Sequence, residues 1–284
     1  MRFRLLPLLA TALVAGCGGG DSSEPAFEGA PLERQDPGPI HVHGLGINPA
    51  DKALFIATHT GLYRVAPGDR KARLVGDLRQ DTMGFSVAGP DRFIGSGHPD
   101  LRTDLPPLLG LIESTDAGKT WKPISLLGKA DFHVLRSADR YVYGFDAGNA
   151  RLLVSSDRGR TWEQRAAPEP LLDLVPRPGT PTTAIASGSV LYRTDDGGQN
   201  WSALGGEAGY LVWPSPDRLY QVVGSGQVRV SRDGGRAFRP LGTIGGEPAA
   251  FLAVSRTELY AALHDGTIKV SRDAGRNWSI RSTP

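Results

Sequence analysis

Five copies of one eight-residue pattern recur along the chain and constrain its fold more than any other feature. They read STDAGKTW (114–121), SSDRGRTW (155–162), TDDGGQNW (194–201), SRDGGRAF (231–238) and SRDAGRNW (271–278). Their terminal aromatic residues are separated by 41, 39, 37 and 40 positions. A period of about forty residues is that of a four-stranded propeller blade, which packs only on its neighbours. The repeat therefore predicts an all-β chain built as a β-propeller.

The residue types within the pattern suit a tight turn. The Asp carboxylate can accept backbone N–H bonds, the Gly can take a positive φ angle, and the terminal aromatic side chain can pack beneath the sheet. The copies resemble the Asp box, or bacterial neuraminidase repeat. We expect its five carboxylates to stabilise turns and to take no part in catalysis; they are Asp116, Asp157, Asp196, Asp233 and Asp273.

The segments between the boxes repeat one order of four short strands. Residues 209–242 show this order most clearly, as GYLVWPS, RLYQVVG, QVRVS and FRPLG. The stretch before the first box fits the same template with a degenerate box, because GLYRV (61–65) matches VLYRT (190–194) and ARLVG (72–76) supplies a fourth strand. Counting that stretch gives six blades. We therefore expect a six-bladed β-propeller of four-stranded blades over residues 40–284.

The first residues indicate export. Arg2 and Arg4 precede an apolar run from Leu5 to Val14, which is too short to span a bilayer as a mature helix. The run closes on LVAGC, which resembles the bacterial lipobox and implies cleavage before Cys17 and its acylation. Cys17 is the only cysteine in the chain, and lipid attachment accounts for a lone thiol in an exported protein. The alternative is an ordinary secretory signal with an incidental cysteine.

These features divide the chain into three parts. Residues 1–16 are the expected lipoprotein signal peptide, residues 17–39 the acylated cysteine and a flexible tether, and residues 40–284 the propeller. We expect a lipid-anchored protein of the cell envelope. Gly18 after the cysteine, by the resemblance to lipoproteins, favours the outer membrane if the organism has one. The formal net charge of +2 gives no reason to expect a nucleic acid partner.

All six histidines are expected on one face of the ring. In an up-and-down blade, the turn between strands three and four lies on the face that carries the Asp boxes. The start of strand one and the turn between strands two and three lie on the opposite, top face. Three histidines fall at starts of first strands and three at or just beyond ends of second strands; they are His41, His43 and His133, and His59, His98 and His264.

The starts of the first strands can be aligned directly. HVHGL, DTMGF, DFHVL and LLDLV place one residue from each of four blades at an equivalent position that lines the channel; these are His43, Met83, His133 and Asp173. Two residues earlier, on the same expected strand face, stand His41, Asp81 and Asp131. The pattern predicts a ring of imidazole, thioether and carboxylate groups at the channel mouth.

Such a ring suits a metal ion, because neutral imidazole binds zinc and copper, carboxylate can complete either site, and a thioether favours copper. We predict one copper or zinc ion, held first by His41, His43 and His133. The further ligands expected are His59, His98 and Met83, and the supporting carboxylates are Asp81, Asp131 and Asp173. The alternative is that the histidines hydrogen-bond backbone groups, and we favour it for His264, in the turn-like ALHDGT.

Residues 40–284 resemble Asp-box propellers, most closely bacterial exported proteins labelled glycosyl hydrolase or sialidase-like. The same architecture occurs in photosystem assembly factors and the sortilin ectodomain, which bind proteins, so the resemblance does not fix the activity. A sialidase of this fold would carry an arginine triad with an early Arg-Ile-Pro motif, but the first strand reads HVHGLGINP. We expect a binding module for a transition metal or an envelope protein; the alternative is a glycoside hydrolase acting on cell-envelope or external glycans.

Overall fold

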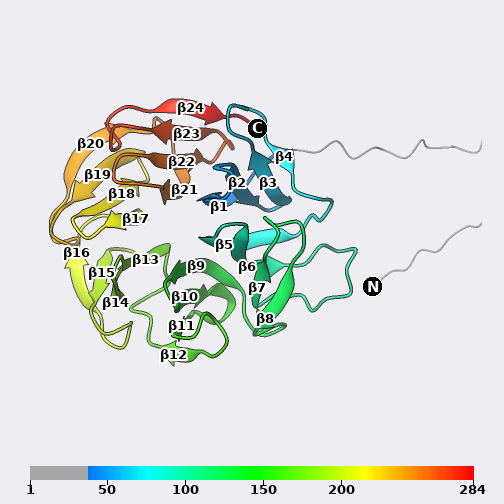
Figure 1. Ribbon diagram of the computed structural model, residues 1–284. Coiled ribbons are helices and arrows are strands. Elements are labelled where there is room, and N and C mark those ends of the chain that lie inside the picture. The colour runs from blue at the N-terminus through cyan, green and yellow to red at the C-terminus, as the bar shows by residue number, and fades with distance from the viewer. Residues whose placement is uncertain (1–37) are drawn as a thin grey trace, which may run out of the picture. The chain divides into compact units, whose positions relative to one another are not determined.

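The computed structural model describes residues 38–284, which form a six-bladed β-propeller (Figure 1). Each blade is a four-stranded antiparallel sheet of strands that are consecutive in the sequence. The first strand of each blade lies innermost and the fourth outermost, as Figure 1 shows. The predicted fold class and blade number are confirmed. Within the described residues, the one helical element is a 3₁₀ turn, η1 (Ala147–Asn149).

The strands of the first three blades follow in chain order. Blade 1 is β1 (Val42–Ile47), β2 (Leu54–Thr58), β3 (Gly61–Val65) and β4 (Arg73–Leu74); blade 2 is β5 (Asp81–Gly89), β6 (Arg92–His98), β7 (Leu111–Ser114) and β8 (Lys122–Ser125); blade 3 is β9 (Phe132–Ala138), β10 (Tyr141–Asp146), β11 (Arg151–Ser155) and β12 (Glu163–Arg165).

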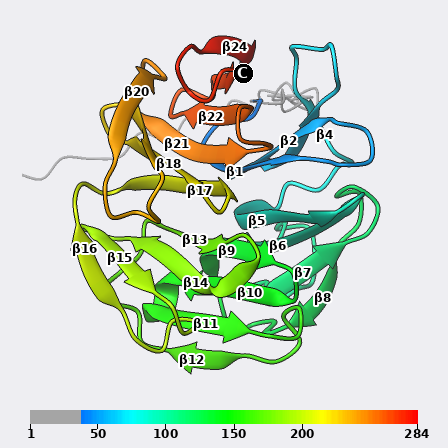
Figure 2. The ribbon, with the colours of Figure 1, turned by 60° about the vertical axis from the view of Figure 1, so that its left-hand side comes forward.

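The other three blades complete the ring, and Figure 2 shows two of them, blades 4 and 5, turned toward the viewer. Blade 4 is β13 (Asp173–Arg177), β14 (Thr180–Ser187), β15 (Leu191–Thr194) and β16 (Ser202–Gly205); blade 5 is β17 (Gly209–Ser215), β18 (Arg218–Val223), β19 (Gln227–Ser231) and β20 (Arg239–Thr243); blade 6 is β21 (Pro248–Ala253), β22 (Leu259–Leu263), β23 (Ile268–Ser271) and β24 (Ser279–Ser282).

Each pair of neighbouring blades shares one hydrophobic core. Six clusters of buried side chains are present in the described residues, and each draws its members from two adjacent blades. Between blades 1 and 2, for example, the rings of Phe55 and Phe93 meet edge to face with centroids 4.7 Å apart. Burial of such faces, which a single sheet cannot cover alone, drives the blades together.

The last blade closes the ring on the first without exchanging a strand. Their shared core contains Val42 and Tyr63 from blade 1 and Tyr260 from blade 6. At the outer edge, Ser282 donates a hydrogen bond to the Arg70 carbonyl at 2.7 Å. Figure 1 shows β24 beside blade 1 at this closure. Ring closure therefore depends on blade packing and on a few edge contacts.

The Asp boxes form the turns between third and fourth strands of blades 2 to 6. In blade 3, Ser155 Oγ donates to Asp157 Oδ1 and accepts the Gly159 N–H, both at 2.8 Å. Asp157 Oδ1 also accepts the Thr161 N–H at 2.9 Å. Ser/Thr–Asp pairs with this geometry occur in all five boxes; the carboxylates are those of Asp116, Asp157, Asp196, Asp233 and Asp273.

Several predicted strands match the structure closely. The predicted segments 61–65, 209–215 and 227–231 are β3, β17 and β19. The predicted fourth strand of blade 1, residues 72–76, contains only the two-residue β4, because the preceding turn lacks the Asp-box geometry that aligns the other fourth strands. The predicted signal peptide, Cys17 and most of the tether lie outside the described residues. In residues 38–284, no helix has the length and apolar character needed to cross a membrane.

Candidate metal centre

Strand pairing places the predicted site residues of blades 1 to 3 at one end of the channel. Asp81, at the start of β5, pairs with His98, at the end of β6. In blade 3, Phe132 at the start of β9 pairs with Asp146 at the end of β10. The Asp-box turns lie at the opposite ends of these strands, since successive strands run antiparallel. We call the end with the histidines the channel mouth.

A β-bulge interrupts each of the first three inner strands at the channel mouth. The pairing register shifts between Val42 and Gly44, between Thr82 and Gly84, and at the corresponding place in β9. The residues left outside the ladder are His43, Met83 and His133. A bulge bends the strand and redirects the side chain that it contains. The aligned positions therefore share a local structure that their spacing alone did not reveal.

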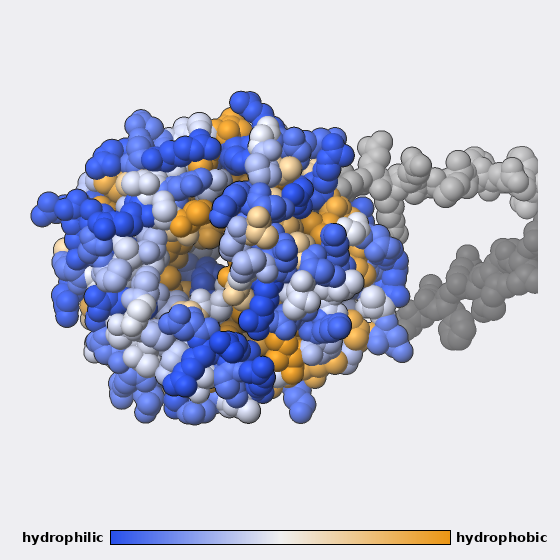
Figure 3. Space-filling model, in the orientation of Figure 1, coloured by the Kyte–Doolittle hydropathy of each residue, from blue (hydrophilic) through white to orange (hydrophobic). Residues whose placement is uncertain are grey.

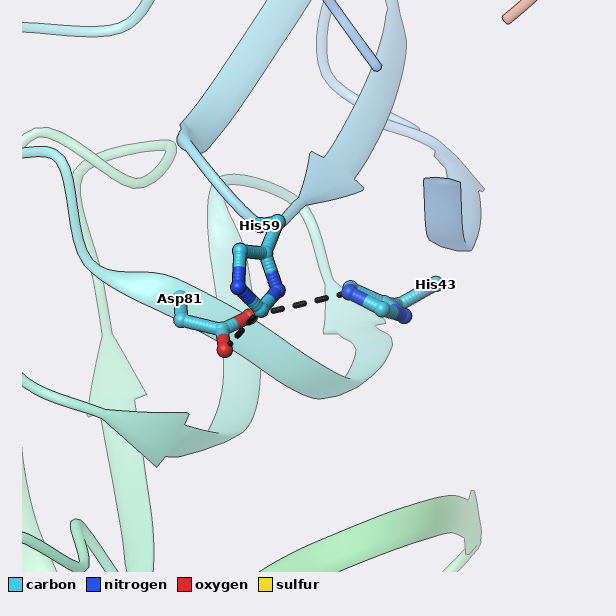
Figure 4. Close-up of side chains that lie close together, drawn as sticks. All are labelled: His43, His59 and Asp81. Carbon is cyan, nitrogen blue, oxygen red and sulfur yellow. Dashed lines mark ion pairs between the residues drawn. The ribbon is translucent and has the colours of Figure 1, made fainter. Parts of the chain in front are cut away.

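Three side chains from blades 1 and 2 converge and form what we call the first mouth group, His43, His59 and Asp81 (Figure 4). His59 Nδ1 lies 3.1 Å from Asp81 Oδ2, and His43 Nε2 lies 3.6 Å from Asp81 Oδ1. One donor atom from each residue can be chosen so that all three lie within 4.8 Å of one another. Two imidazoles and a carboxylate are a donor set used by transition-metal sites.

A second cluster lies at the junction of blades 2 and 3, and we call it the second mouth group, His98, Asp131 and His133. Asp131 Oδ2 is 2.9 Å from His133 Nε2 and 3.5 Å from His98 Nε2. His98 Nδ1 lies 2.8 Å from the Pro107 carbonyl oxygen. Because a carbonyl oxygen can only accept, Nδ1 carries the proton and the lone pair of neutral His98 is on Nε2, toward Asp131.

The two mouth groups contain buried polar atoms that lack hydrogen-bond partners among the described residues. They are His43 Nε2, Asp81 Oδ1 and Asp131 Oδ1. Burial, with the neighbouring imidazoles of His59, His133 and His41, lowers the pKa of His43 to about 4, so its ring is neutral at physiological pH. Burial also raises the pKa of the Asp81 carboxyl. Buried polar groups normally have partners, so these three atoms are candidate donors to a ligand.

His41 differs from the prediction that it shares a strand face with His43. It precedes β1 and has a left-handed φ of 53°, so it does not belong to the strand. Its ring is exposed, with its centroid 6.0 Å from that of His59. The predicted first ligands His41, His43 and His133 are thus not one compact set. His59 and Asp81 come closer to His43 than strand alignment indicated, because they approach it from the end of β2 and from the next blade.

Asp173 has a role unlike that of the other aligned positions. No bulge occurs at the start of β13, and Asp173 is fully buried. Its Oδ1 accepts from Arg136 at 2.7 Å, and its Oδ2 accepts the Leu211 N–H at 2.8 Å. It therefore joins blades 3, 4 and 5 across the channel wall. His264 follows β22 and lies 3.9 Å from the Glu247 carboxylate, outside both mouth groups.

The channel has two unlike walls around a cavity of about 410 Å³. His43, Met83 and His133 line one side. The wall from blades 5 and 6 is mainly apolar and includes Tyr210, Val212, Trp213, Phe251 and Leu252. Figure 3 shows hydrophobic residues around the central hollow of an otherwise largely hydrophilic surface. Sequence reasoning missed this wall, although the apolar segments GYLVWPS and PAAFLA were a signal for it.

The comparisons with known proteins agree with this architecture. The family model of the BNR/Asp-box repeat matches residues 192–203, which contain the box of blade 4. The chain is thus a six-bladed β-propeller with Asp-box turns. No curated protein is similar to it in sequence.

Solved structures share the fold of this Asp-box propeller at low identity. A GH74 enzyme of Niastella koreensis is 14% identical with a TM-score of 0.62, and the match covers 86% of this chain and 45% of that one. The GH74 xyloglucanase of Xanthomonas campestris is 16% identical with a TM-score of 0.53 and the same coverages, 86% and 45%. This chain thus spans less than half of those enzymes.

A third structure, YCF48 bound to D1 peptide, is similar over most of its length. It is 15% identical to this chain with a TM-score of 0.52, and the match covers 86% of this chain and 83% of that one. The neighbours therefore include glycoside hydrolases and a propeller with a bound peptide. At these identities the likeness establishes the fold alone.

Proposed function

We propose that the protein is a binding module that holds a zinc or copper ion at the channel mouth through His43, His59 and Asp81. The observation that carries this proposal is the pair of buried, unpartnered atoms His43 Nε2 and Asp81 Oδ1, which face each other at 3.6 Å. A cation between them would satisfy both. Its coordination would offset the cost of burying a carboxylate next to a neutral imidazole.

The first mouth group supports this reading through its chemistry and its freedom to adjust. Zinc bonds to imidazole nitrogen and carboxylate oxygen are about 2.0–2.2 Å long. The three donor atoms, which lie within 4.8 Å of one another, must therefore draw closer around an ion. His59 can make that movement, because it follows β2 and its side chain is 61% exposed. Three protein donors leave a coordination position for water or for a ligand in the channel.

A glycoside hydrolase is less well supported by the channel. Such an enzyme needs two carboxyl groups on opposite sides of the bond that it cleaves. Asp81 and Asp131 both belong to the histidine-bearing side, and Asp173 is occupied by Arg136 and a backbone N–H. The wall of blades 5 and 6 is mainly apolar. We therefore propose binding without covalent catalysis, and a metal-free preparation should release no sugar from xyloglucan or a fluorogenic sialoside.

Metal titration of the purified full chain tests the function. After removal of bound metal with a chelator, calorimetry and elemental analysis with Zn²⁺ or Cu²⁺ should show saturable uptake by the wild type. Asp81→Asn should lose at least one bound equivalent, since an amide oxygen is a poorer and uncharged donor. His264→Gln, a histidine change on the same face outside the mouth groups, should bind as the wild type does. No uptake by the wild type, or equal uptake by Asp81→Asn, contradicts the proposal.

The location of the protein is a separate proposal that depends on Cys17. The LVAGC motif supports acylation of this residue and attachment to a membrane of the cell envelope, where an envelope protein or glycan could meet the propeller. Metabolic labelling with an alkynyl fatty acid should mark the wild type and leave Cys17→Ala unmarked. Label on Cys17→Ala would contradict lipid attachment at this residue.

A further inference from the structure

The second mouth group lies where the propeller repeat places a copy of the first. In the first group, His43 is the bulge residue of blade 1, His59 follows the second strand, and Asp81 begins the next blade. One blade further, the corresponding residues are Met83 at the bulge, His98 at the end of the second strand, and Asp131 just before the next blade. His133, the bulge residue of blade 3, adds another imidazole beside Asp131.

The side chains of His98 and His133 are partly exposed, and both direct Nε2 toward Asp131 Oδ2. The hydrogen bond to the Pro107 carbonyl leaves His98 Nε2 free to face Asp131. The backbone around Asp131 is also fixed, because its N–H donates to Oδ1 of the fully buried Asp146 at 3.2 Å. Arg151 donates to Oδ2 of Asp146 at 2.8 Å. Supporting hydrogen bonds of this kind orient the ligands of metal sites.

Asp131 itself lacks part of its hydrogen bonding. Its side chain is 10% exposed, and Oδ1 has no hydrogen-bond partner within the described residues. A cation beside Asp131 would satisfy this oxygen, which burial separates from water.

We propose that the channel mouth holds a second transition-metal ion, bound by His98, Asp131 and His133. This inference depends on the proposed function, and it changes a single-ion site into a pair of sites on adjacent blade junctions. Uptake at the second site displaces the proton that His133 shares with Asp131. Met83, at the bulge position that His43 has in the first group, lines a cavity together with His133, and a thioether favours copper.

Metal stoichiometry separates this inference from the proposed function. The full chain, freed of metal and then loaded with Cu²⁺, should contain two equivalents by elemental analysis. Asp81→Asn should contain one, through loss of the first site, and His98→Gln should contain one, through loss of the second. His264→Gln should keep two. One equivalent in both the wild type and His98→Gln overturns the second site and leaves the first, whereas no uptake by the wild type overturns both.

Electron paramagnetic resonance gives a second readout that a merely structural histidine would not change. Two neighbouring Cu²⁺ ions interact magnetically, so the wild-type spectrum should be broadened relative to that of an isolated ion. His98→Gln and His133→Gln should each show an isolated-ion spectrum and a melting curve that confirms folding. An isolated-ion spectrum in the fully loaded wild type, identical to those of both variants, overturns the paired site.

Discussion

The carboxylates at the two ends of the blades have opposite environments. At the Asp-box end, Asp157 is half-buried, its Oδ1 accepts backbone N–H bonds from Arg160 and Thr161, and its Oδ2 accepts the Thr161 hydroxyl. These bonds, with that from Ser155, lower its pKa to about 2. At the channel mouth, Asp81 is largely buried, its Oδ1 has no hydrogen-bond partner in residues 38–284, and burial raises its pKa.

This contrast distinguishes a carboxylate that stabilises the fold from one that, in the proposed site, binds a ligand. A carboxylate with several donors stabilises the turn that supplies them, whereas a buried carboxylate with an unsatisfied oxygen lowers stability. Proteins retain such costly groups where function requires them. Substitutions in the box should therefore lower the free energy of unfolding, and substitutions of the mouth carboxylates should not.

The largest effect is expected at the box glycine of blade 3. Gly159 has a φ of 81°, and a Cβ there would lie 2.1 Å from Leu111 Cδ2 of blade 2. Gly159→Ala should lower the free energy of unfolding by about 2–4 kcal/mol, from left-handed strain and overpacking. Gly205 has a φ of 75° with nothing within 4 Å of such a Cβ, so Gly205→Ala isolates the strain. Equal losses in the two variants, measured by urea denaturation, would show that the contact between blades contributes nothing.

A smaller loss is expected for the buried hydroxyl of the same box. Ser155 Oγ bonds to Asp157 and accepts the Gly159 N–H, and the residue is 1% exposed. Ser155→Ala should lower the free energy of unfolding by about 1–3 kcal/mol, because it leaves a buried N–H unsatisfied. Ser202→Ala, at an exposed position of β16, should change it by less than about 0.5 kcal/mol. Urea denaturation of both variants checks this, and a Ser155→Ala curve that overlays the wild type would refute the structural role of the hydroxyl.

The contributions of Asp157 and Asp81 to the stability of the fold should change in opposite directions as the pH falls. The pKa of Asp157 falls from 3.8 to about 2 on folding, so its stabilising contribution is present above pH 3.8 and is lost as the pH falls toward 2. Asp157→Asn should therefore flatten the dependence of the melting temperature on pH between 4 and 2. The pKa of Asp81 is raised on folding, so its contribution is present below pH 3.8 and is lost as the pH rises through its folded pKa.

Melting curves of the metal-free protein from pH 2 to 7 test both signs. Relative to the wild type, the melting temperature of Asp81→Asn should rise as the pH increases above 4. The melting temperature of Asp157→Asn relative to the wild type should fall as the pH increases from 2 to 4. Curves for the two variants that run parallel to the wild type would contradict the assignment of these pKa shifts to folding.

The sequence predicted the blades well because their determinants are local and repeated. A box of fixed residue types ends each third strand, and strand alternation then determines which residues face which end of the ring. This is why His59 and His98 could be assigned to the same end as His43 from their positions in the chain alone. The degenerate box of blade 1 gave a short fourth strand, which the template could not predict.

The convergence of the mouth residues could not be predicted in the same way. The strand period puts His41 and His43 on one face, but the left-handed φ of His41 and the bulge at His43 break that period. The approach of His59 to Asp81 depends on how two blades pack, which no spacing within one blade encodes. Sequence reasoning therefore placed these residues at one end of the ring, but it could not predict which side chains approach one another, because backbone irregularity and blade packing decide their directions.

The smallest change in melting temperature is expected for Asp81→Asn, and comparing this variant with Asp157→Asn tests the contrast between the two ends most directly. Melting temperatures at pH 7 should be measured for the wild type, Asp81→Asn and Asp157→Asn, each without metal and with excess Zn²⁺. Without metal, Asp81→Asn should melt at or slightly above the wild type, because it removes an unsatisfied buried charge, and Asp157→Asn should melt below the wild type.

Zn²⁺ should raise the melting temperature of the wild type and of Asp157→Asn more than that of Asp81→Asn. If Asp81→Asn instead melts as far below the wild type as Asp157→Asn, and Zn²⁺ shifts all three equally or not at all, the mouth carboxylate serves the fold and the metal site is contradicted.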